Sequence, residues 1–485
     1  MTGVAELTPS PVPAQPAAWS AWLRAVLVLA AVALLGAQPV VLPIAQQWLA
    51  AQTATAAADY ATAADALAEV AARLPYWAPA QHRAGLAAIS AERFDEAIRY
   101  LKAAAALDGW TATRHTALGD AYFGQGNTEA ALAEWEQALA ELPNDDALLV
   151  RLANNYESVG RYADAVTALN ALAAVRPDDP AVFYRLAVLT AATAPNDAPP
   201  RLSLVAAQSP DLAPMVQLLL DAIAAGQANG NPEVTFAKVG YAFEQLSEWR
   251  LAELALAQAV TLNPDYADAY VYLGLAQDMQ GKDGTPAYEQ AVKLAPESAV
   301  AQFFFGLHYR RTGDSQTALT YLLAAQQLDQ ANPAIAAEVG GAYAAVGDLA
   351  LAETWLTQAV TLAEQDVRWW LLLARFYVDN EYRVADYGLP AARQAVALAP
   401  DNAQAIDNLG FALVLTGDLA NGQKLLEQAL ALDPQAPSVY YHLGVLHSRQ
   451  GQTADAELML NHALALDPDG YYGGLALQAL ARLGQ

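Results

Sequence analysis

Residues 112–145 read ATRHTALGDAYFGQGNTEAALAEWEQALAELPND, and this stretch decides the fold. Leu118 and Tyr122 lie four residues apart with Gly119 between them, where a larger side chain would block close approach of a second helix. Residues 124–126 provide a Gly-Gln-Gly turn, and an apolar stripe at helical spacing then runs to Pro143. The stretch predicts two short helices around a tight turn. One such pair cannot bury both of its faces, so it needs copies of itself on either side.

The pattern recurs along the chain at a nearly constant interval. The small residue equivalent to Gly119 falls at Gly85, Gly119, Ala153, Ala187, Gly240, Gly274, Gly306, Gly340, Ala374, Gly410 and Gly444. Successive differences are 34, 34, 34, 53, 34, 32, 34, 34, 36 and 34 residues. An aromatic residue keeps step with it at Tyr122, Tyr156, Phe243, Tyr309, Tyr343 and Tyr377. The chain resembles the tetratricopeptide repeat family, which implies an all-α, right-handed α-solenoid (superhelix) of stacked helical hairpins.

The repeats and the segments between them give a domain plan. We predict a disordered tail over 1–20, a transmembrane or signal-anchor helix over 21–45, and a helical lead-in or partial repeat over 46–77. An N-terminal repeat block follows over 78–193, then an irregular Pro-rich insertion or divergent repeat over 194–232. The C-terminal repeat block covers 233–470, and a capping helix covers 471–485. In the lead-in no Gly or Pro marks an internal turn, so one long helix is an alternative to a partial repeat.

Residues 25–45 suggest a membrane anchor because they carry no charge. Between Trp22 and Trp48 a helix would span about 39 Å at about 1.5 Å per residue, which is close to the thickness of a bilayer with its interfaces. Trp19, Trp22 and Trp48 are placed as interfacial anchors, and Arg24 favours a cytoplasmic N-terminus with extracytoplasmic repeats in a bacterial cell. A cleaved signal peptide, which would release a soluble periplasmic or secreted protein, and a buried solenoid helix are the alternatives.

Composition argues against several kinds of function. The 51 Asp and Glu residues outnumber the 25 Lys and Arg residues, which gives a net charge of −26 and disfavours nucleic acid as a partner. There are no cysteines, and no phosphate-binding loop, nucleophile elbow or zinc-protease motif occurs. His442, His447 and His462 share one repeat, but they are interpreted as packed or surface histidines. We therefore predict no enzyme activity, no cofactor and no metal.

The family resemblance also implies where partners would bind. In tetratricopeptide repeat proteins the first helices of successive repeats line a concave groove that holds peptide or helical segments of protein partners. By register, the groove-lining candidates are Asn154, Tyr241, Phe303, Leu307, Arg310, Arg311, Arg375, Phe411 and Tyr441.

A separate hypothesis concerns three arginines, because cations are scarce in this chain: Arg310, Arg311 and Arg375. They could face one acidic ligand, or they could pair with nearby acids. The expected function is a membrane-tethered scaffold or adaptor. A recruiting or regulatory subunit of an enzyme complex is the alternative.

Overall fold

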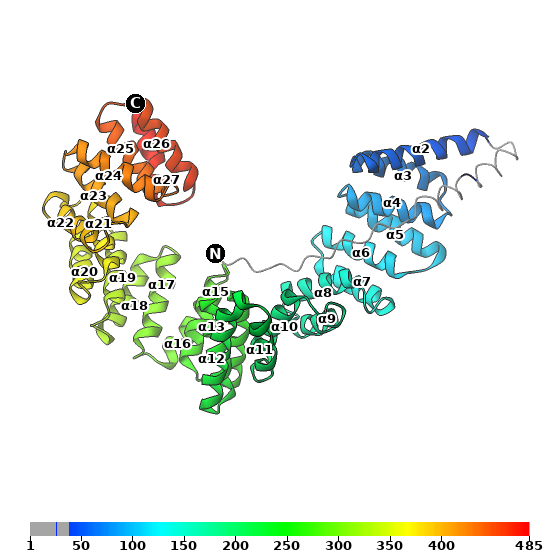
Figure 1. The fold of residues 1–485 in the computed structure, drawn as a ribbon, viewed down its shortest axis with the longest axis horizontal. Coiled ribbons are helices and arrows are strands. Elements are labelled where there is room, and N and C mark those ends of the chain that lie inside the picture. Colours follow the sequence, from blue (N-terminus) through cyan, green and yellow to red (C-terminus); the bar gives the residue numbers. More distant parts are fainter. Residues whose placement is uncertain (1–25, 27–37, 485) are drawn as a thin grey trace. The chain divides into compact units, whose positions relative to one another are not determined.

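The computed structural model describes residue 26 and residues 38–484, and every regular element within those ranges is helical (Figure 1). The chain divides into two compact units, Met1–Ala255 and Leu256–Gln485. The described α-helices of the first unit are α2 (Gln38–Ala56), α3 (Tyr60–Arg73), α4 (Ala78–Ser90), α5 (Phe94–Asp108), α6 (Ala112–Gly124), α7 (Thr128–Glu141), α8 (Asp146–Ser158), α9 (Tyr162–Val175), α10 (Pro180–Thr193), α11 (Pro199–Gln208), α12 (Ala213–Asn229) and α13 (Pro232–Gln245).

Helix α14 (Trp249–Leu262) crosses the boundary between the two units. The second unit contains α15 (Ala267–Asp278), α16 (Thr285–Leu294), α17 (Ala299–Arg311), α18 (Ser315–Leu328), α19 (Pro333–Ala345), α20 (Leu349–Leu362), α21 (Val367–Asp379), α22 (Leu389–Leu398), α23 (Ala403–Leu415), α24 (Leu419–Leu432), α25 (Pro437–Arg449), α26 (Thr453–Leu466) and α27 (Tyr471–Leu483). The all-helical, repeating architecture expected from the sequence is therefore confirmed.

In repeats whose reference small residue is a glycine such as Gly119 or Gly340, close contact at that glycine holds the helical hairpin together. A Cβ added to Gly119 on α6 would lie 2.4 Å from the indole nitrogen of Trp135 on α7. Trp135 is fully buried, and its indole N–H donates to the carboxylate of Asp120 at 3.1 Å. The glycine therefore lets the two helices approach closely enough for α7 to bury a large side chain against α6. At Gly340 the same place is taken by Leu356, whose Cγ would lie 2.7 Å from an added Cβ.

The tight turns between first and second helices use two local features. Gly347, between α19 and α20, has φ of 85°, a left-handed conformation that glycine adopts without steric cost. The next residue, Asp348, accepts a hydrogen bond from the backbone N–H of Leu351 at 3.0 Å and so caps α20. With Val346, this Gly-Asp pair makes the whole connection between the end of α19 and the start of α20.

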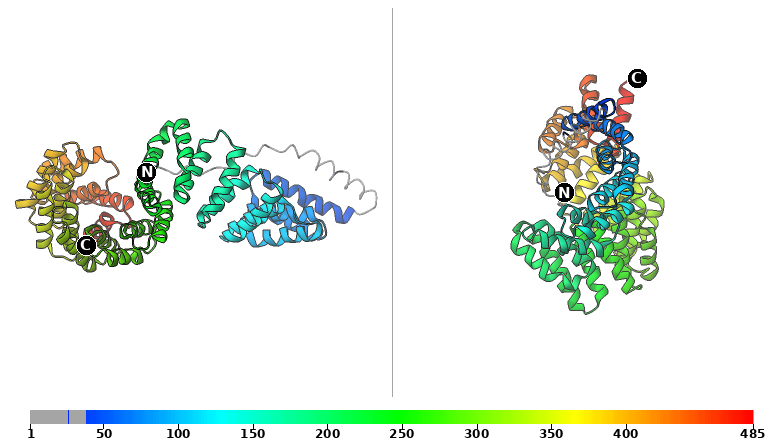
Figure 2. Two further views of the ribbon diagram at one scale, coloured as in Figure 1. Left: turned by 90° about the horizontal axis from the view of Figure 1, so that it is seen from below. Right: turned by 90° about the vertical axis from the view of Figure 1, so that its right-hand side faces the viewer.

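In the second unit the first helices of successive repeats lie in one row. Helix α15 packs against α17, α17 against α19, α19 against α21, α21 against α23, and α23 against α25. Helix α27 then packs against both α25 and α26, in the place that the first helix of another repeat would take. In the left view of Figure 2 the red C-terminal end of the chain lies on the inner side of the curved helices of the second unit. We call the side of these first helices that faces away from the second helices the first-helix face.

The N-terminal region differs from the expectation of a membrane anchor. No helix in the described part of the chain is both long enough and apolar enough to span a bilayer, so the predicted single-pass membrane topology is corrected. Most of the predicted anchor, residues 21–45, lies outside the described residues, and so does the predicted tail, residues 1–20. The predicted anchor residues Trp19, Trp22 and Arg24 therefore lie outside the described part as well. The described end of the anchor is the start of α2, which packs against α3.

Trp48, one of the predicted interfacial residues, is half-buried and packs against two side chains of the first unit. Its ring lies 5.7 Å from that of Trp77, and the guanidinium of Arg83 lies 4.4 Å from its ring centroid. The lead-in is a helical hairpin and not one long helix. Its turn uses Ala58 at φ of 57° in place of a glycine, and Asp59 caps α3 by accepting from the N–H of Thr62.

The Pro-rich segment 194–232 is mostly helical. Pro199 and Pro214 lie in the first turns of α11 and α12, where proline costs no backbone hydrogen bond. Short 3₁₀ turns at Pro195–Asp197 and Pro210–Leu212 connect these helices to their neighbours. Prolines in the segment predicted to be an irregular insertion or divergent repeat therefore initiate helices.

Candidate partner-binding surface

All nine groove candidates lie on first helices. Asn154 is on α8 and Tyr241 is on α13, both in the first unit. In the second unit, α17 carries Phe303, Leu307, Arg310 and Arg311, while Arg375, Phe411 and Tyr441 lie on α21, α23 and α25. Asn154 is exposed, Phe303, Leu307 and Tyr441 are half-buried, and Phe411 is buried.

The three arginines of the acidic-ligand hypothesis bind three different carboxylates. Arg310 forms an ion pair with Glu338 on α19, in the following repeat. Arg311 turns to the preceding repeat, where Nη2 lies 2.6 Å from Oδ1 of Asp278. On α21, Nε of Arg375 donates to Asp379 at 3.1 Å. Adjacent positions on one helix therefore point to opposite neighbours, and acids of this chain satisfy each guanidinium.

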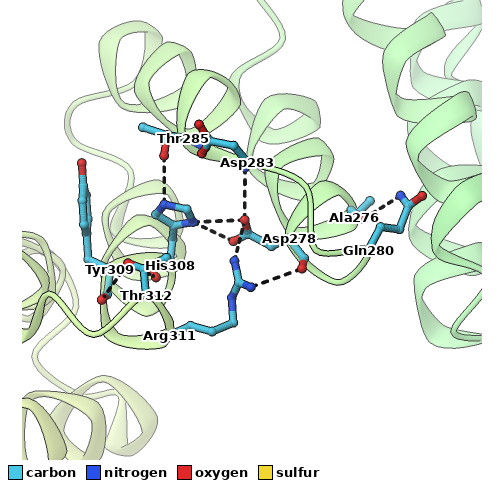
Figure 3. A network of polar contacts seen from close by, with 10 residues as sticks. Ala276, Asp278, Gln280, Asp283, Thr285, His308, Tyr309, Arg311 and Thr312 are labelled. Carbon is cyan, nitrogen blue, oxygen red and sulfur yellow. Dashed lines mark hydrogen bonds and ion pairs between the residues drawn. The ribbon is translucent and has the colours of Figure 1, made fainter.

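Asp278 is the centre of a buried polar network between α15, α16 and α17 (Figure 3). His308 donates from Nδ1 to Oδ2 of Asp278 at 2.8 Å, and the backbone N–H of Gly284 donates to Oδ1 at 3.1 Å. The hydroxyl of Thr285 lies 2.9 Å from Nε2 of His308. An acid, a histidine and a hydroxyl in this order resemble the arrangement of a nucleophilic site.

The carboxylate of Asp278 stabilises the local structure, and this role explains the network. It forms an ion pair with Arg311 and accepts from the backbone N–H just before α16. Helix α16 begins late, in the repeat that is two residues shorter than its neighbours. A Cβ on Gly284 would lie 2.5 Å from the carbonyl oxygen of Gly274, so this turn leaves no space for a larger residue. The network closes the shortened turn.

A second buried Asp–His pair lies between α23 and α25. His442 donates from Nδ1 to Asp407 at 2.7 Å, and Ser438 donates to the other oxygen of the same carboxylate at 2.8 Å. The imidazole stacks on Phe411 with ring centroids 3.8 Å apart. His442 is fully buried, and its Nε2 has no hydrogen-bond partner among the described residues. His447 and His462 pair elsewhere, with Gln452 and with the ring of Tyr440, so the three histidines do not meet.

The C-terminal helix contacts the first-helix face three repeats back. The phenol of Tyr472, on α27, donates to Asp379 on α21 at 3.2 Å. The guanidinium of Arg375 lies 5.7 Å from the ring of Tyr472 and 5.8 Å from that of Tyr471. The rings of Tyr441 and His442 lie 6.1 and 5.7 Å from that of Tyr472. Two of the groove candidates, Arg375 and Tyr441, are therefore in contact with the chain's own last helix.

In the first unit, the first helices carry ionisable groups that register alone did not identify. Arg185 on α10 forms a bidentate ion pair with Glu157 on α8. Its Nη1 lies 3.8 Å from Oε2 of Glu248. On α13, Lys238 lies 6.0 Å from the ring of Tyr241. Burial raises the pKa of Glu244 to about 8, and its Oε1 is buried with no hydrogen-bond partner among the described residues. A carboxyl group with this environment is neutral over much of the physiological range.

Comparison with known proteins identifies the family. Two sequence profiles, both described as tetratricopeptide repeat, match the chain: one over residues 122–189 and 413–482, the other over 82–147, 240–285 and 282–333. Together these segments span more than half of the chain. The chain belongs to the tetratricopeptide repeat family, whose members generally mediate protein–protein interactions and scaffold complexes.

Solved structures also match the chain. Yeast Tom70 is 16% identical with a TM-score of 0.39, and the match covers 85% of this chain and 96% of that one. A tetratricopeptide repeat protein from Parabacteroides merdae is 16% identical with a TM-score of 0.44, covering 52% of this chain and 99% of that one. The APC/C hetero-tetramer Cut9–Hcn1 is 13% identical with a TM-score of 0.39, covering 91% and 96%. Curated protein sequences give no match.

Proposed function

We propose that this protein is a non-enzymatic scaffold or adaptor that binds peptide or helical segments of protein partners along its first-helix face. The observation that supports this most is the row formed by α15, α17, α19, α21, α23 and α25. It presents partly exposed apolar side chains such as Phe303 and Leu307 beside fixed ion pairs. A pre-formed surface of this kind binds an extended partner without first having to order itself.

The charges favour partner segments of limited acidity. The chain carries a net charge of −26, and Arg310, Arg311 and Arg375 are each neutralised by an acid of this chain. A strongly acidic partner would meet repulsion at long range and would have to displace those acids at contact. Partner segments that are neutral or basic, with apolar side chains for the surface around Leu307, fit the described face better.

The test compares one substitution on the proposed binding face with one on a second helix. Leu307→Glu places a charge on the first-helix face, and Leu328→Glu does the same at the exposed end of α18. The tagged full chain is isolated from its native cells, and the amount of stoichiometric partner is measured. Loss of the partner with Leu307→Glu alone supports the proposal, and equal recovery with both variants overturns it. Circular dichroism confirms that both variants are folded.

A further inference from the structure

The first turn of α27 is stabilised by side-chain contacts more than by the helix propensity of its residues. The helix begins Tyr471-Tyr472-Gly473-Gly474, and glycine is among the poorest residues for a helix. Gly473 is required at its position, because an added Cβ would lie 1.7 Å from the carbonyl oxygen of Asp467. Gly474 is not, since an added Cβ would meet no atom within 4 Å. The first turn of α27 therefore contains a glycine, Gly474, that lowers helix stability although packing does not require it.

The residues around Tyr472 form a site suited to a tyrosine side chain. We define the tyrosine site as Arg375, Asp379, Tyr441 and His442. Asp379 accepts from the phenol, Arg375 lies over the ring, and the other two rings surround it. The Asp379 side chain is 8% exposed, so its carboxylate is largely removed from water and gains from a donor. Burial raises the pKa of the Tyr472 phenol, which therefore remains a donor throughout the physiological range.

We propose that Tyr472 is an internal ligand, and that the tyrosine site binds a tyrosine side chain of a partner segment when the first turn of α27 is released. This inference rests on the proposed function, because it places a specific side chain of the partner on the first-helix face. The internal tyrosine competes at a high effective concentration, since it is tethered beside the site by Asp467, which accepts from the N–H of Tyr472 at 2.9 Å. Binding of a partner is thereby coupled to opening of the C-terminal helix.

The test uses the full chain and a synthetic peptide of residues 467–477, DPDGYYGGLAL, as the probe. Tyr472→Phe keeps the packed ring and removes only the phenol donor, whereas Tyr471→Ala/Tyr472→Ala removes both rings. Gly474→Ala acts in the opposite direction, because it stabilises the helix. The fraction of molecules in which the first turn of α27 is open should fall by up to about fivefold. Peptide affinity is measured for these variants and for the unmodified chain by fluorescence anisotropy.

We expect the affinity to be highest for the double variant, about tenfold lower or more for the unmodified chain, and lowest for Gly474→Ala. A peptide with Phe in place of the tyrosine equivalent to Tyr472 should bind the double variant about tenfold more weakly, as for loss of a hydrogen bond to a charged group. Adding Asp379→Asn should reduce this difference between the Tyr and Phe peptides, because a neutral amide oxygen is a weaker acceptor than a carboxylate. Gly474→Ala also slows amide exchange in the first turn of α27, which verifies that the helix is strengthened.

Equal peptide affinity for the unmodified chain, Tyr472→Phe and Gly474→Ala would overturn the proposal, and so would failure of the double variant to distinguish the Tyr peptide from the Phe peptide. Either result would concern the tyrosine site alone. The comparison of Leu307→Glu with Leu328→Glu judges the wider first-helix face separately.

Discussion

His308 donates a hydrogen bond to Asp278 at 2.8 Å although 30 residues separate them in the sequence. The two residues come from the first helices of consecutive repeats, with Asp278 on α15 and His308 on α17, and they are only 4% and 5% exposed. The bond thus joins two hairpins through the polar network that also starts α16.

Replacing Asp278 should destabilise this junction. Asp278→Ala leaves the buried His308 and the N–H of Gly284 without an acceptor, so we expect a loss of about 2–4 kcal/mol in the free energy of unfolding. Urea denaturation measures the loss, and amide exchange at the start of α16 localises it. Asp283→Ala is the control, since Asp283 is exposed and only caps Thr285. Equal effects of the two variants would contradict the structural role of the network.

The contact between Gly119 and Trp135 gives a prediction about the repeat itself. Gly119→Ala should force the indole of Trp135 from its place and destabilise the first unit by about 1–3 kcal/mol. The measurement is the urea midpoint followed by tryptophan fluorescence. Gln137→Ala, on the exposed side of α7, should change stability by less than about 0.5 kcal/mol. A neutral Gly119→Ala would show that the hairpin does not depend on close approach at this residue.

Glu244 should give the first unit a recognisable pH dependence. Its pKa is raised from 4.5 to about 8 by burial, so between these values the folded chain holds a proton that the unfolded chain has lost. Stability contributed by this group is therefore full below pH 4.5 and declines as the pH rises toward 8, by up to about 1.4 kcal/mol per pH unit. Glu244→Gln cannot lose the proton, so it should gain stability relative to the unmodified chain across that range.

Urea midpoints at pH 5, 6.5 and 8 would measure that difference, with exposed Glu129→Gln as the control. A constant difference between Glu244→Gln and the unmodified chain would mean that the carboxyl group is solvated.

Trp48 should stabilise the N-terminal hairpin through its contacts with Trp77 and Arg83. Trp48→Ala removes an aromatic pair and a cation–π contact, which together contribute about 1–2 kcal/mol. Thermal denaturation would measure the loss of stability, and amide exchange in α2 and α3 would localise it. Leu49→Ala alters a neighbour that is 63% exposed and should have little effect. If both variants behaved alike, the packing of Trp48 would not matter for the hairpin.

The repeat architecture was predictable because its cause is local. Close approach at Gly119 and a Gly-Asp turn such as Gly347-Asp348 can be recognised within a single repeat. The lead-in hairpin was harder to predict, because Ala58 adopts the left-handed conformation that usually marks glycine. The anchor was inferred from an uncharged segment, its length and its flanking tryptophans, and none of these could show that Trp48 packs on Trp77.

The sequence predicted which helices carry the candidate surface residues, but not which side chains those residues contact. Register placed Arg310 and Arg311 on a first helix, where they lie in the structure. Their partners Glu338 and Asp278 lie in different repeats, so these pairs depend on side-chain direction. The pair formed by Asp407 and His442 was missed because its members are 35 residues apart. Comparing acids and histidines at neighbouring register positions of consecutive repeats would have found it.

The central claim is that partners bind along the first-helix face. Hydrogen exchange of the full chain, with and without the partner isolated from native cells, tests this claim most directly. The account predicts slower exchange in first helices such as α17, α21 and α23, with second helices such as α18 and α24 unchanged. Protection confined to the second helices would contradict it.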